Sequence, residues 1–170
     1  VPIARVPQTT SKGRLFYEMR AIGANQFKLY VREGVNGAER LLIDPSTLRG
    51  PNDVHMSLDW WLASPEGRYV VYGLSPAGSE NSVAQILDVD NNKILPERID
   101  RTQYASPSWL PDSSGFFFNR LAEGVKVGAQ DYYLDSVAWL HRLGTDPKQD
   151  LKVLARGQYP GVMLDRTDFP

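Results

Sequence analysis

One short sequence motif occurs three times in the chain, and this repeat restricts the possible folds more than any other feature. Two copies are clear, residues 61–72 (WLASPEGRYVVY) and 109–118 (WLPDSSGFFF), and residues 11–17 keep only the second half of the phrase. Each copy joins a polar turn ending in Gly to a run of β-branched and aromatic residues, which predicts a tight hairpin followed by a buried strand. The turn glycines, Gly13, Gly67 and Gly115, lie 54 and 48 positions apart. A unit of about 40–50 residues repeated in this way is typical of a β-propeller or a related all-β array.

The hydrophobic pattern predicts strands throughout. Phe27, Leu29 and Val31 alternate with polar residues and so share one strand face. The second strand of each repeat is apolar almost throughout, as expected when neighbouring sheets cover both of its faces. No window of 11 or more residues shows a helical apolar period, so we predict an all-β fold. The predicted strands are 14–20, 26–33 and 38–44; 58–63, 68–75, 83–90 and 93–99; and 104–110, 115–121, 136–143 and 151–156.

The four tryptophans recur within these repeats. Large aromatic side chains at repeated positions of a propeller fill the space between neighbouring sheets. We therefore expect a packing role for Trp60, Trp61, Trp109 and Trp139 rather than ligand stacking. Three sheets are too few to close a ring, and the first residues contain no initiator Met. We therefore expect the chain to be part of something larger.

Composition excludes several classes of function. The 170 residues carry 19 basic and 20 acidic side chains without a basic block. We therefore expect neither a nucleic-acid partner nor a membrane partner. The absence of cysteine excludes disulfides, thiolate zinc sites and a cysteine nucleophile. The compartment stays open between cytoplasm and periplasm, because proteins of both can lack cysteine.

The sequence predicts no catalytic residue. The nearest approach to a Gly-x-Ser-x-Gly nucleophile elbow is residues 73–78, which is one residue too long and has Pro76 where the elbow helix would start. We interpret it as an ordinary loop after a strand. His55 and His141 are the only histidines, and each is predicted to be a surface or packing side chain.

The sequence also predicts no metal and no cofactor. Residues 88–93 begin like a calcium loop, but Lys93 stands where the turn glycine belongs and Ile99 where the bidentate Glu belongs. This stretch is predicted to be a hairpin turn. Carboxylates at strand ends usually bind the local backbone. We expect that solvated role for Asp44, Asp88, Asp90, Asp146 and Asp150.

Residues 58–79 resemble the second blade of prolyl oligopeptidases, the serine peptidases of family S9. Residues 29–32, 40–48 and 141–146 fit the same family in the same order. The resemblance implies a seven-bladed propeller capping an α/β-hydrolase domain that cleaves short peptides after proline. The chain would supply about three four-stranded antiparallel blades, at about 8–50, 51–101 and 102–160, and not the catalytic domain.

The resemblance also implies one substrate-binding residue. In the family, an aromatic side chain after the last strand of the third blade lines the substrate pocket, and Tyr159 lies at about that place. The family usually has Phe there, and the spacing in this chain differs by about one residue. A plain packing or exposed loop role for Tyr159 is the alternative.

Three hypotheses about function remain. The first is a propeller segment that gates access of proline-containing oligopeptides to a catalytic domain, with the rest of the propeller and that domain as partners. The second is a non-catalytic propeller that binds other proteins through blade edges and loops. The third is an isolated propeller piece that self-associates, because open sheet edges recruit partners.

Overall fold

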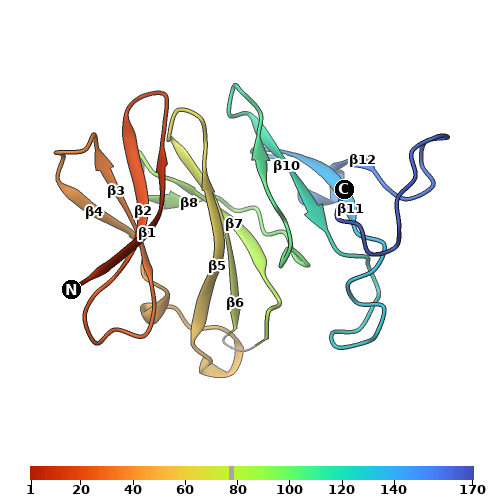
Figure 1. Ribbon diagram of the computed structural model, residues 1–170, viewed down its shortest axis with the longest axis horizontal. Helices are drawn as coiled ribbons and strands as arrows, with labels where there is room; N and C mark the ends of the chain where they lie inside the picture. The colour runs from red at the N-terminus through yellow and green to blue at the C-terminus, as the bar shows by residue number, and fades with distance from the viewer. Residues whose placement is uncertain (77–78) are drawn as a thin grey trace.

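The computed structural model describes residues 1–76 and 79–170 and contains three four-stranded antiparallel sheets (Figure 1). Each sheet is a meander in which consecutive strands are neighbours. The all-β, partial-propeller prediction is confirmed. The strands are β1 (Ile3–Thr9), β2 (Arg14–Arg20), β3 (Lys28–Glu33) and β4 (Glu39–Ile43); β5 (Met56–Ala63), β6 (Tyr69–Pro76), β7 (Val83–Asp88) and β8 (Lys93–Ile94); and β9 (Ser108–Trp109), β10 (Gly115–Arg120), β11 (Val137–Arg142) and β12 (Leu151–Leu154).

Helix is limited to single turns in the described residues. These are the 3-10 helices η1 (Pro45–Thr47), η2 (Pro51–Asp53) and η3 (Pro147–Gln149). None of the helices found there has the length and hydropathy needed to cross a bilayer.

The first strand, β1, was not predicted from the sequence. It pairs antiparallel with β2 from Ile3 opposite Arg20 to Thr9 opposite Leu15, with a bulge between Arg5 and Gln8. Pro7 lies within that bulge, where a missing N–H interrupts no regular ladder. The strand was missed because two prolines near the start of the chain weaken its local strand pattern.

Most predicted strands are within two residues of their observed bounds at each end, but two are much shorter than expected. Strand β8 ends at Ile94 instead of Ile99, because Pro96 cannot donate a ladder hydrogen bond. Ile99 still returns to the sheet through an isolated bridge with Ala84. Strand β9 covers only Ser108–Trp109 of the predicted 104–110, and Ser106 just before it has a positive φ of 41°.

The middle sheet is buried on both faces. Val70, Tyr72 and Leu74 of β6 pack into a core shared with the first sheet, which includes Phe16 and Leu29. The intervening Val71 belongs to a second core, shared with Phe116 and Phe118 of the third sheet. Because successive side chains of a strand point to opposite faces, the apolar residues of β6 are shared between two cores. The predicted burial of this strand on both faces is confirmed.

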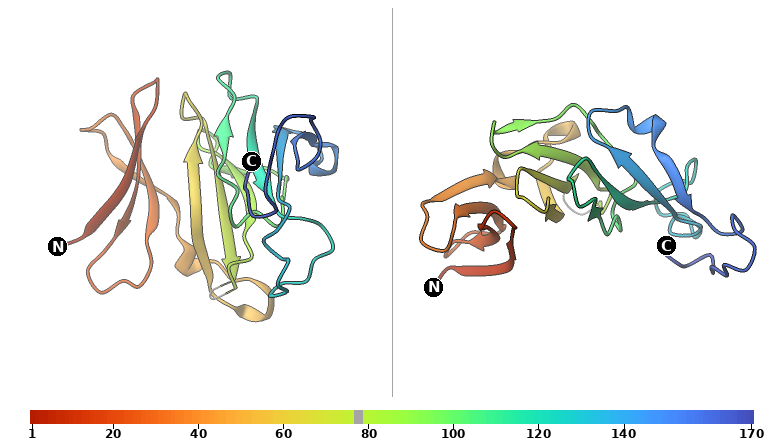
Figure 2. Two further views of the ribbon diagram at one scale, coloured as in Figure 1. Left: turned by 45° about the vertical axis from the view of Figure 1, so that its right-hand side comes forward. Right: turned by 90° about the horizontal axis from the view of Figure 1, so that it is seen from above.

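The three sheets converge at their first strands and diverge at their fourth. The Ala63 N–H of β5 donates to the Gln8 side-chain oxygen of β1 at 3.0 Å, and Trp109 Nε1 of β9 donates to the Leu62 carbonyl of β5 at 3.2 Å. Toward the fourth strands, a hollow of about 350 Å³ opens between β4 and the β7–β8 hairpin. The sheets are therefore radial wedges, and Figure 2 shows them following one another along an arc.

The third repeat is offset from the predicted alignment. The residues that close the three turns with an N–H to the carbonyl three positions earlier are Gly13, Gly67 and Ser113. Their φ values are +82°, +82° and +58°. Gly115, predicted as the third turn glycine, instead begins β10, where an added Cβ would lie 2.2 Å from the His141 carbonyl oxygen. Glycine is needed there for close approach of two strands, while the turn itself uses serine.

The tryptophans pack as predicted. The Trp61 side chain is 6% exposed between the first two sheets and donates to Glu18 Oε1 at 2.8 Å. Trp60 and Trp109 pack against the core between the second and third sheets. Trp139 also lies against that core, with Lys152 Nζ 5.6 Å from its ring centre.

Candidate functional site

The candidate substrate-binding residue, Tyr159, lies in an exposed loop beyond β12. Its side chain is 48% exposed, and its hydroxyl accepts a hydrogen bond from Gln158 Nε2 at 3.2 Å. The loop also exposes Val162 and Met163. The tip of the loop thus exposes one aromatic ring and two apolar side chains beside the third sheet. In Figure 1 the segment projects in dark blue from β12.

Both ends of this loop meet at one carboxylate. Arg156 Nε lies 2.6 Å from Asp135 Oδ1, and Arg166 Nε donates to Asp135 Oδ2 at 2.9 Å. Hydrogen bonds from these two guanidinium groups hold the Asp135 pKa below its usual value. Asp135 was missed in the sequence because its partners lie 21 and 31 residues away, and no local pattern joins them.

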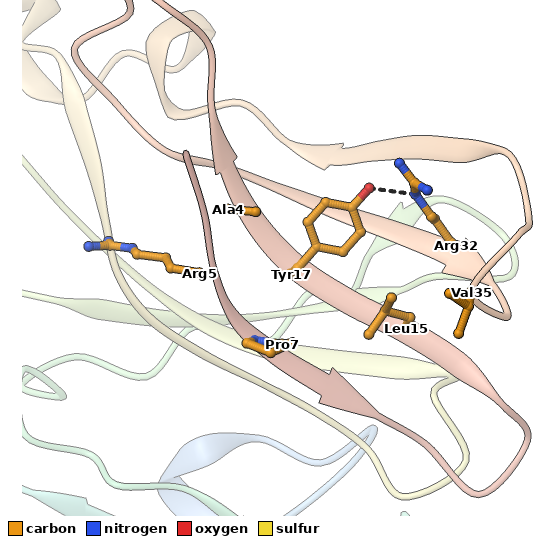
Figure 3. Close-up of a pocket in the computed structure, with 7 residues that line it drawn as sticks. All are labelled: Ala4, Arg5, Pro7, Leu15, Tyr17, Arg32 and Val35. Carbon is orange, nitrogen blue, oxygen red and sulfur yellow. Dashed lines mark hydrogen bonds between the residues drawn. The ribbon is translucent and has the colours of Figure 1, made fainter. Parts of the chain in front are cut away.

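A second cavity lies on the open face of the first sheet (Figure 3). Its volume is about 300 Å³. Arg32 Nε donates to the Tyr17 hydroxyl at 2.7 Å, and that hydroxyl in turn donates to Glu39. Burial and the bond to Glu39 raise the Tyr17 pKa, and the bond from Tyr17 is the main cause that lowers the Glu39 pKa. The polar groups of Tyr17, Arg32 and Glu39 are therefore bound to one another rather than directed at a ligand. The lining residues are Ala4, Arg5, Pro7, Leu15, Tyr17, Arg32 and Val35.

The two histidines have different surroundings, and neither is arranged for catalysis. His55 lies in an exposed loop. His141 is fully buried, with Nδ1 2.7 Å from Asp150 Oδ1 and Nε2 3.9 Å from Glu97 Oε1. A catalytic base would need a nucleophile at Nε2, and a carboxylate occupies that side of the ring. His141 is a packing histidine, as predicted.

Asp150 differs from its prediction. It was expected to be a solvated turn residue, but its side chain is 1% exposed and faces His141. Asp44 and Asp146 do cap turns as predicted, by accepting from the backbone N–H of Ser46 and Lys148. The local pattern is similar at all three positions, and only the fold places a histidine beside Asp150.

The segment that begins like a calcium loop is a hairpin turn whose carboxylates are already bound. Asp88 makes the predicted bonds to the local backbone, from the N–H groups of Asp90 and Asn91, and pairs with Arg68 at 3.4 Å. The predicted solvation is wrong, because its side chain is only 7% exposed. Burial opposes ionisation of Asp88, but the bonds from Asn91 and Arg68 outweigh it and lower its pKa. In the described part of the chain, no group of three or more potential ligands could hold a metal ion.

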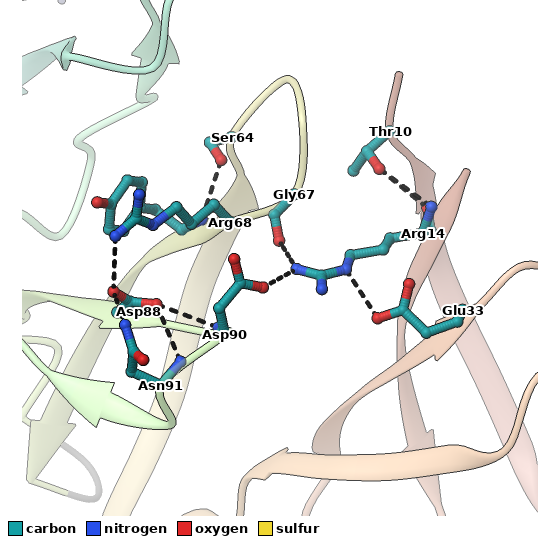
Figure 4. A network of polar contacts seen from close by, with 10 residues as sticks. Thr10, Arg14, Glu33, Ser64, Gly67, Arg68, Asp88, Asp90 and Asn91 are labelled. Atoms are coloured by element: carbon teal, nitrogen blue, oxygen red, sulfur yellow. Dashed lines mark hydrogen bonds and ion pairs between the residues drawn. The ribbon is translucent and has the colours of Figure 1, made fainter. Parts of the chain in front are cut away.

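Arg14 joins the first two sheets beside this turn (Figure 4). Its Nε donates to Glu33 Oε1 of its own sheet at 2.8 Å. Its Nη1 donates to the Gly67 carbonyl at 2.9 Å and lies 2.6 Å from Asp90 Oδ1, both in the second sheet. The contact is a clamp between the two sheets, in which one guanidinium pairs with a carboxylate of each sheet.

In the segment compared with a nucleophile elbow, the described residues 73–76 lie in strand β6 and do not form a strand-to-helix turn. Ser75 lies within β6, is 2% exposed and donates its hydroxyl to Asp59 Oδ1 at 3.0 Å. Residues 77 and 78 of that segment lie outside the described residues. A serine inside a ladder strand lacks the exposed strand-to-helix turn that activates a hydrolase serine.

Comparison with known proteins gives one consistent family. The family model of the prolyl oligopeptidase N-terminal β-propeller domain matches residues 3–168. Prolyl oligopeptidase A of Galerina marginata (strain CBS 339.88) is 32% identical over 147 residues, which are 75% of this chain and 20% of the relative. Prolyl oligopeptidase A of Amanita bisporigera is 30% identical over 134 residues, covering 69% of this chain and 17% of the relative.

Solved structures agree on the fold. A chain from a study of two prolyl endopeptidases superposes with a TM-score of 0.83 at 28% identity, over 96% of this chain and 24% of its own length. Prolyl oligopeptidase B from Galerina marginata, bound to a 35mer hydrolysis and macrocyclization substrate, gives a TM-score of 0.73 at 17% identity over 92% of this chain and 24% of its own length. This chain spans about a fifth of the length of its curated relatives.

Proposed function

The chain belongs to the prolyl oligopeptidase N-terminal β-propeller family, and from this premise we propose that it helps to gate a serine peptidase that cleaves short peptides after proline. In this proposal its three sheets are blades of a seven-bladed ring. We place the blades at about 8–50, 51–101 and 102–160, with β1 extending the first blade to Ile3. Catalysis would be performed by an α/β-hydrolase domain of the full-length protein.

The radial convergence of the three sheets is the observation that carries the gating proposal. The first strands contact one another, as the Gln8–Ala63 and Trp109–Leu62 hydrogen bonds show. Wedges that continue this arrangement enclose a narrow axial channel. An extended peptide is about 10 Å across its full width. A folded domain of about 100 residues has a radius of gyration near 13 Å, so its full width is more than twice that of the peptide. A narrow channel would admit the peptide and exclude the domain.

We further propose that Tyr159 forms part of the peptide pocket. Its half-exposed ring lies on a loop that projects beyond the third sheet, together with the exposed side chains of Val162 and Met163. Exposed apolar groups collected at one site favour contact with a ligand or another domain. A flat aromatic side chain is suited to contact with a proline-containing peptide because it offers a large area at low entropic cost.

The test is labelling of the full-length protein with a fluorophosphonate, which reacts with activated serine hydroxyls. The expected result is one labelled serine outside residues 1–170, together with cleavage of a short peptide on the carboxyl side of proline. A matched peptide with Ala in place of Pro should be cleaved much more slowly. Absence of a reactive serine would support a non-catalytic, protein-binding propeller and would refute the proposal.

A further inference from the structure

The loop between β3 and β4 carries the only Asn-Gly pair of the chain, Asn36 and Gly37. Asn36 is exposed and Gly37 is half-buried, and Val35 of the same loop is drawn in Figure 3. Asn-Gly pairs in two-residue hairpin turns have positive φ at both positions. In this loop the left-handed residue is instead Gly34, with φ +71°. Asn36 and Gly37 are therefore not locked into such a turn.

Within the described residues, the fold holds neither of the two groups of this pair that could react together. No hydrogen bond fixes the Asn36 side-chain amide, and the Gly37 N–H makes none of ordinary length and angle. Asparagine side chains readily reach neighbouring backbone groups. Gly37 also has no Cβ to crowd that approach, and glycine is required there, because a Cβ would lie 2.2 Å from the Glu33 carbonyl oxygen.

The other six asparagines, all among the described residues, lack this combination. Asn91 donates its side-chain amide to Asp88 Oδ2 at 2.9 Å, and Asn81 Oδ1 accepts from the Tyr132 hydroxyl at 2.8 Å. Asn119 is only 7% exposed. The rest are exposed but precede a residue whose Cβ hinders access to the backbone nitrogen; they are Asn25, Asn52 and Asn92.

We propose that Asn36 is a site of spontaneous covalent modification, where it converts to isoaspartate and aspartate. The deprotonated Gly37 nitrogen attacks Asn36 Cγ, a new N–C bond forms, and the side-chain nitrogen leaves as ammonia. Water then opens the resulting cyclic succinimide. Opening at the main-chain carbonyl gives isoaspartate, and opening at Cγ gives aspartate. The steps together consume one water and release one ammonia, so no oxidant and no second substrate is required.

Isoaspartate should disturb the first sheet more than aspartate. It routes the main chain through Cβ and Cγ, and so adds one atom to the backbone of a loop in which Gly37 already presses on Glu33. This loop connects the first pair of the β3–β4 ladder, Arg32 opposite Glu39. The two side chains lie 3.1 Å apart, and both bond to the Tyr17 hydroxyl. Formation of isoaspartate is therefore expected to loosen the pairing of β4.

The experiment follows the full-length protein during incubation in mildly alkaline buffer, in which more of the Gly37 nitrogen is deprotonated. Trypsin cuts after Arg32 and Arg40 and releases residues 33–40, in which Asn36 is the only asparagine. Mass spectrometry measures the loss of the amide. A methyltransferase specific for isoaspartate, supplied with labelled S-adenosylmethionine, measures isoaspartate. Asn36→Gln is the matched control, because the longer side chain must close a larger ring and reacts more slowly.

Asn36 is expected to react about 10-fold faster than any other asparagine of the folded protein, which corresponds to a barrier lower by about 1.4 kcal/mol. The Asn36→Gln variant should lose most of the isoaspartate signal. A rate at Asn36 no higher than the rates at Asn52 and Asn92 would overturn the proposal. So would an isoaspartate signal that is unchanged in Asn36→Gln.

Hydrogen exchange tests the expected effect on the first sheet. In the incubated protein, residues 39–43 of β4 should exchange faster than in fresh protein. The variant Asn36→Asp carries the new charge without the added backbone atom, and should exchange like fresh protein. Equal exchange in incubated and fresh protein would refute the effect on β4. None of these measurements depends on cleavage after proline, so they test the modification separately from the proposed function.

Discussion

His141 Nδ1 lies 2.7 Å from Asp150 Oδ1, and the two side chains are 0% and 1% exposed. The pair is a buried polar contact at the edge of an apolar core, since the His141 ring also packs 5.4 Å from the ring of Phe116 on the neighbouring strand. Glu97 lies on the far side of the imidazole, with Oε1 3.9 Å from Nε2. A histidine thus stands between two buried carboxylates, at the junction of the second and third sheets.

Replacement of His141 should be among the more destabilising substitutions in this chain. His141→Phe keeps the ring packing but leaves Asp150 buried without its partner, and such a loss costs about 3–5 kcal/mol of unfolding free energy. The double variant His141→Phe, Asp150→Leu should recover part of this loss, because the buried Asp150 carboxylate is then removed together with its partner, while Glu97 keeps its bond from the Gly144 N–H. His55→Phe is the control, with a change within about 0.5 kcal/mol as expected at an exposed site.

Urea unfolding followed by tryptophan fluorescence measures these differences. A His141→Phe variant as stable as the parent would show that the buried pair contributes nothing. A double variant less stable than His141→Phe would show that the cause is lost volume or shape rather than an unpaired carboxylate.

The two inter-sheet tryptophans should be sensitive to truncation. Trp61→Ala and Trp109→Ala are each expected to cost about 3–5 kcal/mol, because each removes a large ring from between two sheets. Trp61→Phe keeps much of the packing but removes the donor to buried Glu18, and should cost about 1–2 kcal/mol. Melting temperatures of the Ala variants equal to that of the parent would contradict this placement.

Acid should release the Tyr159 loop. The Asp135 pKa is lowered from 3.8 in the folded protein, mainly by hydrogen bonds from Arg156 and then Arg166. A lowered folded pKa means that the stabilisation is complete above the unfolded pKa of the group and is lost as pH falls through the folded value. Hydrogen exchange of residues 157–165, corrected for its intrinsic pH dependence, should therefore accelerate below about pH 3.8.

Asp135→Asn provides the comparison for this pH effect. Its loop should exchange quickly at every pH, without a transition in the acid range. A parent and a variant that show the same acid transition would indicate that another group controls the loop.

The Arg14 clamp should show an energetic coupling between the first two sheets. A double-mutant cycle of Arg14→Met and Asp90→Asn is expected to give about 0.5–1 kcal/mol, because the pair is only partly shielded from solvent. The coupling should fall in 1 M NaCl, where the Debye length is about 3 Å. The exposed pair Arg49–Asp53 serves as the control and should couple more weakly. Equal coupling in both pairs would argue against a clamp.

Local pattern was sufficient to predict most of the fold. Strand β2 was predicted with its observed bounds, because it follows a turn closed at Gly13 and carries a dense apolar run. The burial of β6 on both faces could also be predicted, because a strand that is apolar at every position needs other residues to cover both of its faces. The turn and the apolar runs are properties of short segments, so the local sequence is sufficient to predict them.

The features that were missed depend on distant contacts. Strand β1 exists because β2 offers it an edge, although Pro7 lies within it and Pro2 directly before it. Ser113 occupies the turn position that glycine holds in the other repeats, and this shifted the predicted alignment of the third copy. Asp135 and Asp150 differ from other turn aspartates only through partners that the fold supplies.

The most direct test of the gating account is the rate at which the full-length protein cleaves one proline-containing sequence in two contexts. The sequence is offered as a free peptide of about ten residues and as an exposed loop of a stable folded domain too wide for a narrow axial channel. The account predicts rapid cleavage of the free peptide and almost none of the domain, with cleavage restored when the domain is unfolded. Equal cleavage of the peptide and the folded domain would contradict it.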